Sequence, residues 1–215
     1  MPDRSEKVIA AKEAAARRAA ERGDTGSHAP TQDRLPPGQY LVAKFPVLDL
    51  GIRKPMALEE WSLAVSGLAE RTQPITWAEL SSLPRVEVVA DFHCVTRWSL
   101  YDLSWAGVRF RDVLELIRPL PKARFVMQYG RDGYSTNLPL EALMDDNVLL
   151  AYELAGEPIS LEHGGPIRTI IPRRYAWKGA KYLSGIELMA EDRPGFWEQR
   201  GYHNEGDPWK EERYW

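Results

Sequence analysis

The amino-acid sequence predicts one compact domain of mixed α and β structure, preceded by an N-terminal arm. Three observations support this prediction. The chain of 215 residues is 44% hydrophobic and 27% charged, which is typical of globular proteins. From Leu35 onward, short segments are separated by glycine, proline and aspartate. Several of these segments alternate apolar and polar residues, as half-buried strands do.

Residues 1–34 form the predicted arm. They contain no aromatic residue, and their alanines are interleaved with charged residues. Residues 6–22 have good helix propensity, but Val8 and Ile9 are the only sizeable apolar side chains that such a helix can dock. We therefore expect a flexible or solvent-facing helical arm with a disordered link at residues 23–27, followed by a domain over residues 35–215.

Two elements are predicted at the start of the domain. Residues 61–65 alternate in the manner of a half-buried strand, which ends at Gly67. Thr76 and Glu79 have the spacing of a capping box, so a short helix begins there. A proline follows Leu83 and ends this helix.

A second strand is predicted over residues 86–93. Its even-numbered residues from Val86 to Phe92 share one face, so the strand delivers Cys94 at its end. Residues 110–117 predict a helix that a proline closes. The second half of the chain predicts five strands, separated by glycine-containing turns after residues 132 and 155. These strands cover residues 125–129, 134–138, 148–154, 167–171 and 182–188.

The composition excludes several classes of function. A formal net charge of −3 gives no general electrostatic footprint for nucleic acid. No run approaches the roughly 20 apolar residues that span a bilayer, and the charged start lacks the apolar segment of a secretory signal. We expect a cytoplasmic protein that neither binds nucleic acid nor inserts into a membrane. Cys94 is the single cysteine, which excludes an intrachain disulfide and a zinc site built from several thiolates.

Cys94 is the first candidate for chemistry, and three interpretations of it are open. It can be a buried cysteine that acts as a small hydrophobic residue. It can be the nucleophile of a Cys–His hydrolase, with His163 or His203 as the base, because the adjacent His93 points to the opposite face of the strand. It can also be the one protein ligand of a metal whose other ligands come from a cofactor.

Three further segments are candidates for ligand binding. Residues 162–168 place two glycines beside a histidine and an arginine, without the pattern of a P-loop or a dinucleotide fold. Residues 173–181 gather four cations and two aromatic residues, which can hold a phosphate and stack a heterocycle. The tail from Pro194 is rich in aromatic residues, so we expect it to fold back, where Tyr202 or His203 can form a pocket wall. Each segment also has a plain structural interpretation, as a turn, a solvated basic face or a cover of the core.

Together these segments resemble the molybdopterin-binding domain of the sulfite oxidase family, and most closely its small bacterial members. In that family a cysteine at the end of a strand is the only protein ligand of molybdenum, and Cys94 matches it. The family's HGxPVR segment is similar to residues 163–168, and its lysine in a VKW-like sequence to Lys181. Its active-site tyrosine in a W-x4-Y element matches Tyr202, and a shared Trp-x-Gly before a helix matches residues 105–107.

The resemblance implies an α+β fold with mixed sheets or a barrel-like β core and short helices. It implies Mo-molybdopterin as the cofactor and Cys94 as the metal ligand. Tyr202 is then a hydrogen-bond or proton donor to the reacting oxygen, and Arg97 and Trp105 line the pocket. The residues implied to bind the cofactor are His93, Phe45, Thr136, His163, Arg168, Lys178, Gly179, Ala180 and Lys181.

The function implied by the resemblance is oxygen-atom transfer to or from a small sulfur- or nitrogen-oxide substrate. An external electron carrier is expected, since the chain shows no haem-binding domain. Residues 95–97 depart from the asparagine and the arginine pair that follow the cysteine in sulfite oxidases, and residues 44–48 lack an expected arginine. Fewer cations weaken the binding of a sulfite dianion. A non-catalytic molybdopterin-binding or carrier module and a metal-free Cys–His hydrolase are the alternatives.

Overall fold

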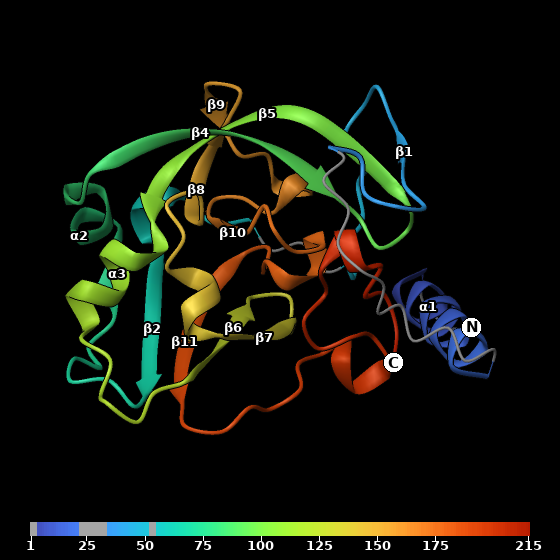
Figure 1. Cartoon of the computed structure of the whole chain (residues 1–215). Coiled ribbons are helices and arrows are strands. Elements are labelled where there is room, and N and C mark those ends of the chain that lie inside the picture. Colours follow the sequence, from blue (N-terminus) through green and yellow to red (C-terminus); the bar gives the residue numbers. More distant parts are fainter. Residues whose placement is uncertain (1–3, 22–33, 52–54) are drawn as a thin grey trace.

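Two mixed β-sheets build the domain, with short helices around them (Figure 1). The computed structural model describes residues 4–21, 34–51 and 55–215. The predicted mixed α and β fold is confirmed. Within the described residues the strands form two separate sheets and not a closed barrel, because β3 and β7 are left as the open edges of one of them.

The first sheet is organised around β5 (Trp98–Arg109). The strand β4 (Arg85–His93) pairs antiparallel with it. The first residues of β5 pair in parallel with β1 (Tyr40–Leu41). The last residues of β5 pair antiparallel with β8 (Leu149–Leu154). The strands β9 (Glu157–Pro158) and β10 (Arg168–Ile170) both pair with β8.

The second sheet has the strand order β3-β2-β11-β6-β7. Its central strand β11 runs parallel to β2 and antiparallel to β6. A buried cluster joins this sheet to α3, with Leu63, Leu114 and Ile186 among its members. The strands are β2 (Ser62–Gly67), β3 (Ile75–Thr76), β6 (Phe125–Gly130), β7 (Ser135–Pro139) and β11 (Leu183–Met189).

Three α-helices accompany the sheets in the described part of the chain, namely α1 (Arg4–Glu21), α2 (Trp77–Ser82) and α3 (Phe110–Ile117). The capping box is present, since Thr76 Oγ1 accepts from Glu79 N at 3.3 Å and Glu79 Oε2 accepts from Thr76 N at 3.0 Å. None of the described helices is long and apolar enough to cross a membrane. Short 3₁₀ helices lie at Leu58–Glu60, Leu140–Leu143, Leu161–His163, Ala176–Lys178, Glu198–Arg200 and Pro208–Lys210.

The strands predicted by alternation are all present, but the longest strand, β5, is missed. Its residues Trp105 to Val108 are buried one after another, so no alternation marks them. Asp102 adopts a left-handed φ of +55°, and the pairing register shifts next to Gly107. These irregularities hide a strand of twelve residues from a pattern of period two.

The helix expected in the arm is formed by α1, but only one of its sides faces solvent. Ala16 is 2% exposed, and Ile9 packs against the core. The missing side chain of Gly201 permits this close approach, since a Cβ placed on Gly201 would lie 3.1 Å from the Ala16 Cβ. The expected link at residues 23–27 lies outside the described residues. The division of the chain after residue 34 stays a prediction.

Candidate functional site

Cys94 lies in the tight turn that joins β4 to β5, at the place where the alternation of β4 predicts it. Its N–H donates to the Trp98 carbonyl at 2.9 Å, and Arg97 N–H donates to the Cys94 carbonyl at 3.0 Å. Arg97 adopts a left-handed φ of +77°, which reverses the chain direction. Cys94 Sγ lies 3.1 Å from Thr96 Oγ1.

Distant segments fix this turn from outside. Gln39 Nε2 donates to the Cys94 carbonyl at 3.0 Å, and Tyr40 N–H donates to the Arg97 carbonyl at 2.8 Å. Arg213 Nη1, from the C-terminal tail, donates to the Val95 carbonyl at 3.0 Å. Three carbonyls of the turn therefore have partners outside it, and the thiol has little freedom to move.

A pocket opens over Cys94, with a volume of about 730 Å³ that includes the part open to solvent. Its aromatic walls include Phe45, Phe92, Trp98, Trp177, Trp197 and Tyr202. Its charged side chains are Lys12, Asp49, Asp132, Arg168 and Lys181.

Arg168, at the start of β10, brings a buried positive charge to the pocket. Its side chain is 2% exposed, and Nη1 donates to the His163 carbonyl at 2.7 Å. Its Nε has no hydrogen-bond partner among the described residues, and the guanidinium lies over the rings of Phe92 and Trp105. Burial lowers the pKa of Arg168 to about 10. A buried guanidinium whose charge is balanced only in part by a carbonyl and two aromatic rings is suited to bind an anion.

The predicted glycine turn, Lys181 and Phe45 come together beside Arg168. A Cβ on Gly164 would lie 2.6 Å from Lys181 Cγ, so only glycine fits there. Lys181 Nζ donates to the Glu162 carbonyl at 2.8 Å. The ring of His163 stacks on Phe45 with centroids 4.3 Å apart. Three separate segments of the sequence, which carry Phe45, residues 162–168 and Lys181, thus meet at one side of the pocket.

Tyr202 lines the pocket together with Cys94, as the sequence predicts for a residue of the folded-back tail. Its ring stacks on Trp197 at 5.1 Å and meets the edge of Trp177 at 5.2 Å. Burial raises the pKa of Tyr202 far above its ordinary value. The phenol therefore stays protonated and can donate a hydrogen bond into the pocket.

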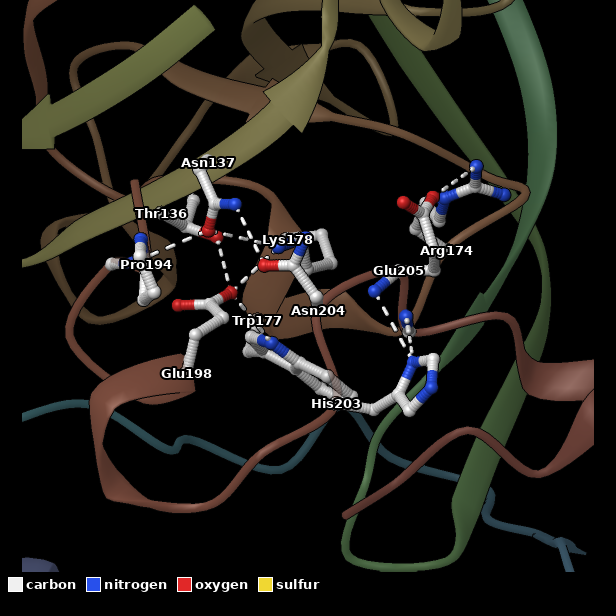
Figure 2. A network of polar contacts seen from close by, with 12 residues as sticks. Thr136, Asn137, Arg174, Trp177, Lys178, Pro194, Glu198, His203, Asn204 and Glu205 are labelled. Atoms are coloured by element: carbon white, nitrogen blue, oxygen red, sulfur yellow. Dashed lines mark hydrogen bonds and ion pairs between the residues drawn. The ribbon is translucent and has the colours of Figure 1, made fainter. Parts of the chain in front are cut away.

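Lys178 and Thr136, two of the predicted cofactor-binding residues, lie outside the pocket lining, and their roles stay predictions. The side chains of both residues contact Glu198 (Figure 2). Lys178 Nζ lies 2.6 Å from Glu198 Oε1, and Thr136 Oγ1 donates to the same oxygen at 2.9 Å. The side chains of Lys178 and Glu198 are both fully buried. This network supports the pocket wall from behind, because Trp177 Nε1 also donates to Glu198 Oε1 at 3.1 Å.

Arg97, Trp105 and His93 also do not line the pocket. Arg97 is exposed at the tip of the turn, and Trp105 is fully buried beneath Arg168. His93 points to the opposite face of β4, where Nδ1 lies 2.8 Å from Ser99 Oγ. The structure therefore does not bring Arg97, Trp105 or His93 to the pocket surface over Cys94, and their predicted roles toward the substrate and the cofactor stay predictions.

Gly179 lines the pocket as predicted, but Ala180 does not. The backbone N–H of Ala180 faces Gln128 Oε1 at 3.4 Å in the interior. A Cβ on Gly179 would lie 2.4 Å from the Thr169 carbonyl oxygen, so the chain passes β10 too closely for a side chain.

Sequence reasoning missed three charged residues of the pocket, namely Lys12, Asp49 and Asp132. Asp132 was recognised only as part of a turn after β6. It is 7% exposed, Oδ1 accepts from Tyr134 N–H at 3.2 Å, and burial raises its pKa. Its place directly after a strand was the one available signal. Lys12 lies in a helix without any motif.

The Cys–His hydrolase has little support in this geometry. Of the two predicted bases, His203 Nδ1 accepts from the N–H groups of Glu205 and Gly206, and His163 stacks on Phe45. Neither histidine is among the described residues that line the pocket with Cys94. Among the residues that the structure describes, no group of three or more histidine, cysteine, aspartate or glutamate side chains is arranged to hold a metal ion.

The family model of the oxidoreductase molybdopterin-binding domain matches residues 50–197, which is more than half of the chain. The chain belongs to this family. It is 41% identical over 182 residues to the oxidoreductase YuiH of Bacillus subtilis, covering 84% of this chain and 92% of that protein. Like that relative, it is an oxidoreductase.

More distant members of the molybdopterin-binding family carry more specific names. The chain is 28% identical to a sulfite oxidase of Arabidopsis thaliana, covering 67% of this chain and 46% of that protein. It is 26% identical to the protein-methionine-sulfoxide reductase catalytic subunit MsrP of Campylobacter jejuni, covering 65% and 52%. The chain therefore spans about half the length of these two relatives.

A solved structure shows the same fold. The sulfane dehydrogenase SoxCD of Paracoccus pantotrophus superposes with a TM-score of 0.59 at 20% identity, over 65% of this chain and 40% of that one.

The cofactor of the family is Mo-molybdopterin, and the residues of the pocket fit it. The thiolate of Cys94 would be a soft sulfur ligand for the molybdenum atom. Arg168 and Lys181 offer cations for the terminal phosphate, and the unpartnered Arg168 Nε is a donor that the protein itself leaves unused. The buried carboxyl group of Asp132 is suited to accept from the N–H groups of a pterin ring.

Proposed function

We propose that this domain transfers an oxygen atom to or from a small sulfur- or nitrogen-oxide substrate at a molybdenum atom held by Cys94. The observation that carries the proposal is that Cys94 and Tyr202 line one pocket together with the cations suited to the cofactor. The names of the sulfite oxidase and the methionine-sulfoxide reductase, both of which act on sulfur oxides, support the same reaction class.

The bound cofactor supplies the redox chemistry, and the protein's residues bind, orient and shield it. Cys94 holds the metal in a turn that Gln39 and Arg213 fix through its carbonyls. Tyr202, protonated at any ordinary pH, donates a hydrogen bond to the substrate oxygen. The rings of Trp177 and Trp197 pack against Tyr202 and keep water away from that oxygen.

An external electron carrier is part of the proposal, because each oxygen-atom transfer moves two electrons that must be supplied or removed. The cytoplasmic location stays a prediction, which cell fractionation checks.

The test begins with protein expressed in a host that makes the cofactor. Elemental analysis is expected to show stoichiometric molybdenum. Sulfite with an oxidising dye is then compared with methionine sulfoxide and an amine N-oxide, each with a reduced dye. We expect turnover of one of these substrates. Fully loaded protein that turns over none of them in either direction would contradict oxygen-atom transfer and favour a carrier module.

A further inference from the structure

The N-terminal helix α1 lies against the C-terminal segment that supplies Tyr202 to the pocket (Figure 1). Glu13 Oε1 forms an ion pair with Arg200 Nε at 2.8 Å. Ala16 is 2% exposed and packs beside Gly201. One face of α1 is therefore docked on the domain, although no pattern in the sequence of the arm predicts a binding surface.

This docking brings Lys12 to the pocket. Lys12 is half-buried and is one of the residues that line the pocket with Cys94 and Tyr202. Its Nζ lies 4.7 Å from the centre of the Trp197 ring, a cation–π contact. The structure gives this ammonium no carboxylate in ion-pair contact among the described residues. Burial lowers the pKa of Lys12, and the carboxylate of Asp49 opposes that shift.

The cations of the pocket fall into two groups. Arg168 and Lys181 are joined through the loop of His163, which resembles the cofactor-binding segment of the family. Lys12 belongs to the other group, since it covers Trp197, on which Tyr202 stacks. Lys12 therefore contacts the aromatic stack of Tyr202, the proposed hydrogen-bond donor, whereas Arg168 and Lys181 contact the loop that fits the phosphate of the cofactor.

We propose that Lys12 recognises the negative charge of the substrate, and that this substrate is a small oxyanion. The inference rests on the proposed function for its substrate, but its test does not require turnover. Arg97, the cation predicted to line the pocket, is exposed at the tip of its turn and does not compete for this role. Asp49 is a carboxylate near Lys12. It forms no ion pair with Lys12, but its charge weakens the attraction between the ammonium and an oxyanion. The partly desolvated ammonium strengthens a charge-assisted hydrogen bond to an oxyanion.

The test measures binding of sulfate, an oxyanion that the oxidised holoenzyme does not turn over, by isothermal titration calorimetry. The variant Lys12→Gln removes the charge, and Lys12→Arg keeps it. Lys7→Gln is the matched control, because Lys7 lies on the same helix and is exposed. Dimethyl sulfoxide serves as the neutral S-oxide. We expect Lys12→Gln to weaken sulfate binding by about tenfold or more, the loss of one charge-assisted bond. Lys12→Arg and Lys7→Gln should stay close to the unchanged protein, and dimethyl sulfoxide should bind equally to all.

Hydrogen exchange of residues 4–21 shows whether α1 stays docked in Lys12→Gln. Unchanged sulfate affinity in a docked Lys12→Gln variant would overturn the inference, as would equal losses for sulfate and dimethyl sulfoxide. If α1 undocks in Lys12→Gln, the Lys12→Arg variant decides instead. It is expected to bind sulfate like the unchanged protein, and weaker binding would overturn the inference. An enzyme that binds sulfate through Lys12 but transfers no oxygen would contradict the proposed function alone.

Discussion

Arg213 Nη1 donates a hydrogen bond to the Val95 carbonyl, 3.0 Å away and one residue beyond the cysteine of the pocket. Its Nη2 donates to the Pro37 carbonyl at 3.1 Å, and the guanidinium lies 4.8 Å from the centre of the Tyr175 ring. The C-terminal tail and the segment before β1 therefore meet at the turn that carries Cys94. The position of the thiol depends on both ends of the domain.

Replacing Arg213 by methionine is expected to destabilise the protein by about 1–3 kcal/mol, because two carbonyls lose a buried, charged donor. Urea unfolding measures this free energy. Arg124→Met is the control, since Arg124 also donates to a carbonyl, that of Pro121, but is exposed. Equal effects of the two variants would show that the Arg213 bonds do not hold the turn.

Replacing Cys94 by serine should leave the fold intact, because the two side chains have nearly the same shape. The sulfur–molybdenum charge-transfer absorption and turnover should both disappear, since the hydroxyl is a poor substitute for a soft thiolate. Thr96→Val is the control that removes the Thr96 hydroxyl beside Sγ but keeps the sulfur. Full turnover by Cys94→Ser would end the assignment of Cys94 as the metal ligand.

The parts of the site that the sequence predicts depend on residues that are close together in the chain. Alternation in β4 is a local property, and it alone delivers Cys94 to the turn. Gly164 sits in a glycine pair whose conformation is equally local. Such signals do not depend on where the rest of the chain folds.

Where the predicted residues and the pocket lining differ, the direction of the side chain is decided by partners far away in the chain. Lys178 appears in a basic run that fits a phosphate, but Glu198 captures its charge in the interior. Lys12 lies in an alanine-rich helix, and only docking on Arg200 and Gly201 brings it to the pocket. No periodicity or motif carries that information.

Replacing Arg168 by methionine is expected to have opposite effects on stability and on cofactor loading. Cofactor-free protein should become as stable as the unchanged protein or more so, because the guanidinium is buried with one carbonyl acceptor. The molybdenum content after expression with the cofactor should fall strongly, because the anion loses its buried partner. Urea unfolding of the apoprotein and elemental analysis measure the two effects. Full loading would show that Arg168 does not hold the cofactor.

Asp132 predicts a pH dependence of the cofactor-free protein. Burial raises the pKa of its carboxyl group above the ordinary value, so the folded state holds the proton more tightly than the unfolded state. This contribution is complete below the ordinary pKa and is lost as the pH rises through the raised pKa. Asp132→Asn removes the ionisation but keeps an oxygen that accepts from Tyr134 N–H. The variant should match the unchanged protein near about pH 3 and exceed its stability increasingly toward about pH 7. A difference that does not change with pH would refute this origin.

The buried pair of Lys178 and Glu198 predicts a large coupling energy in a double-mutant cycle (Figure 2). Lys178→Met leaves a buried carboxylate whose remaining donors in the described part of the chain are Thr136 and Trp177, which is expected to cost about 3–5 kcal/mol. Glu198→Gln keeps an acceptor for these donors but leaves the Lys178 ammonium uncompensated. The double variant should therefore cost much less than the sum of the single variants.

The exposed pair of Arg118 and Glu70, 3.5 Å apart, is the matched control and should show almost no coupling. Urea unfolding of each variant gives the free energies for both cycles. Additive effects at Lys178 and Glu198 would mean that the two side chains are not coupled in free energy. The proposed stabilisation of the pocket wall by this ion pair would then be refuted.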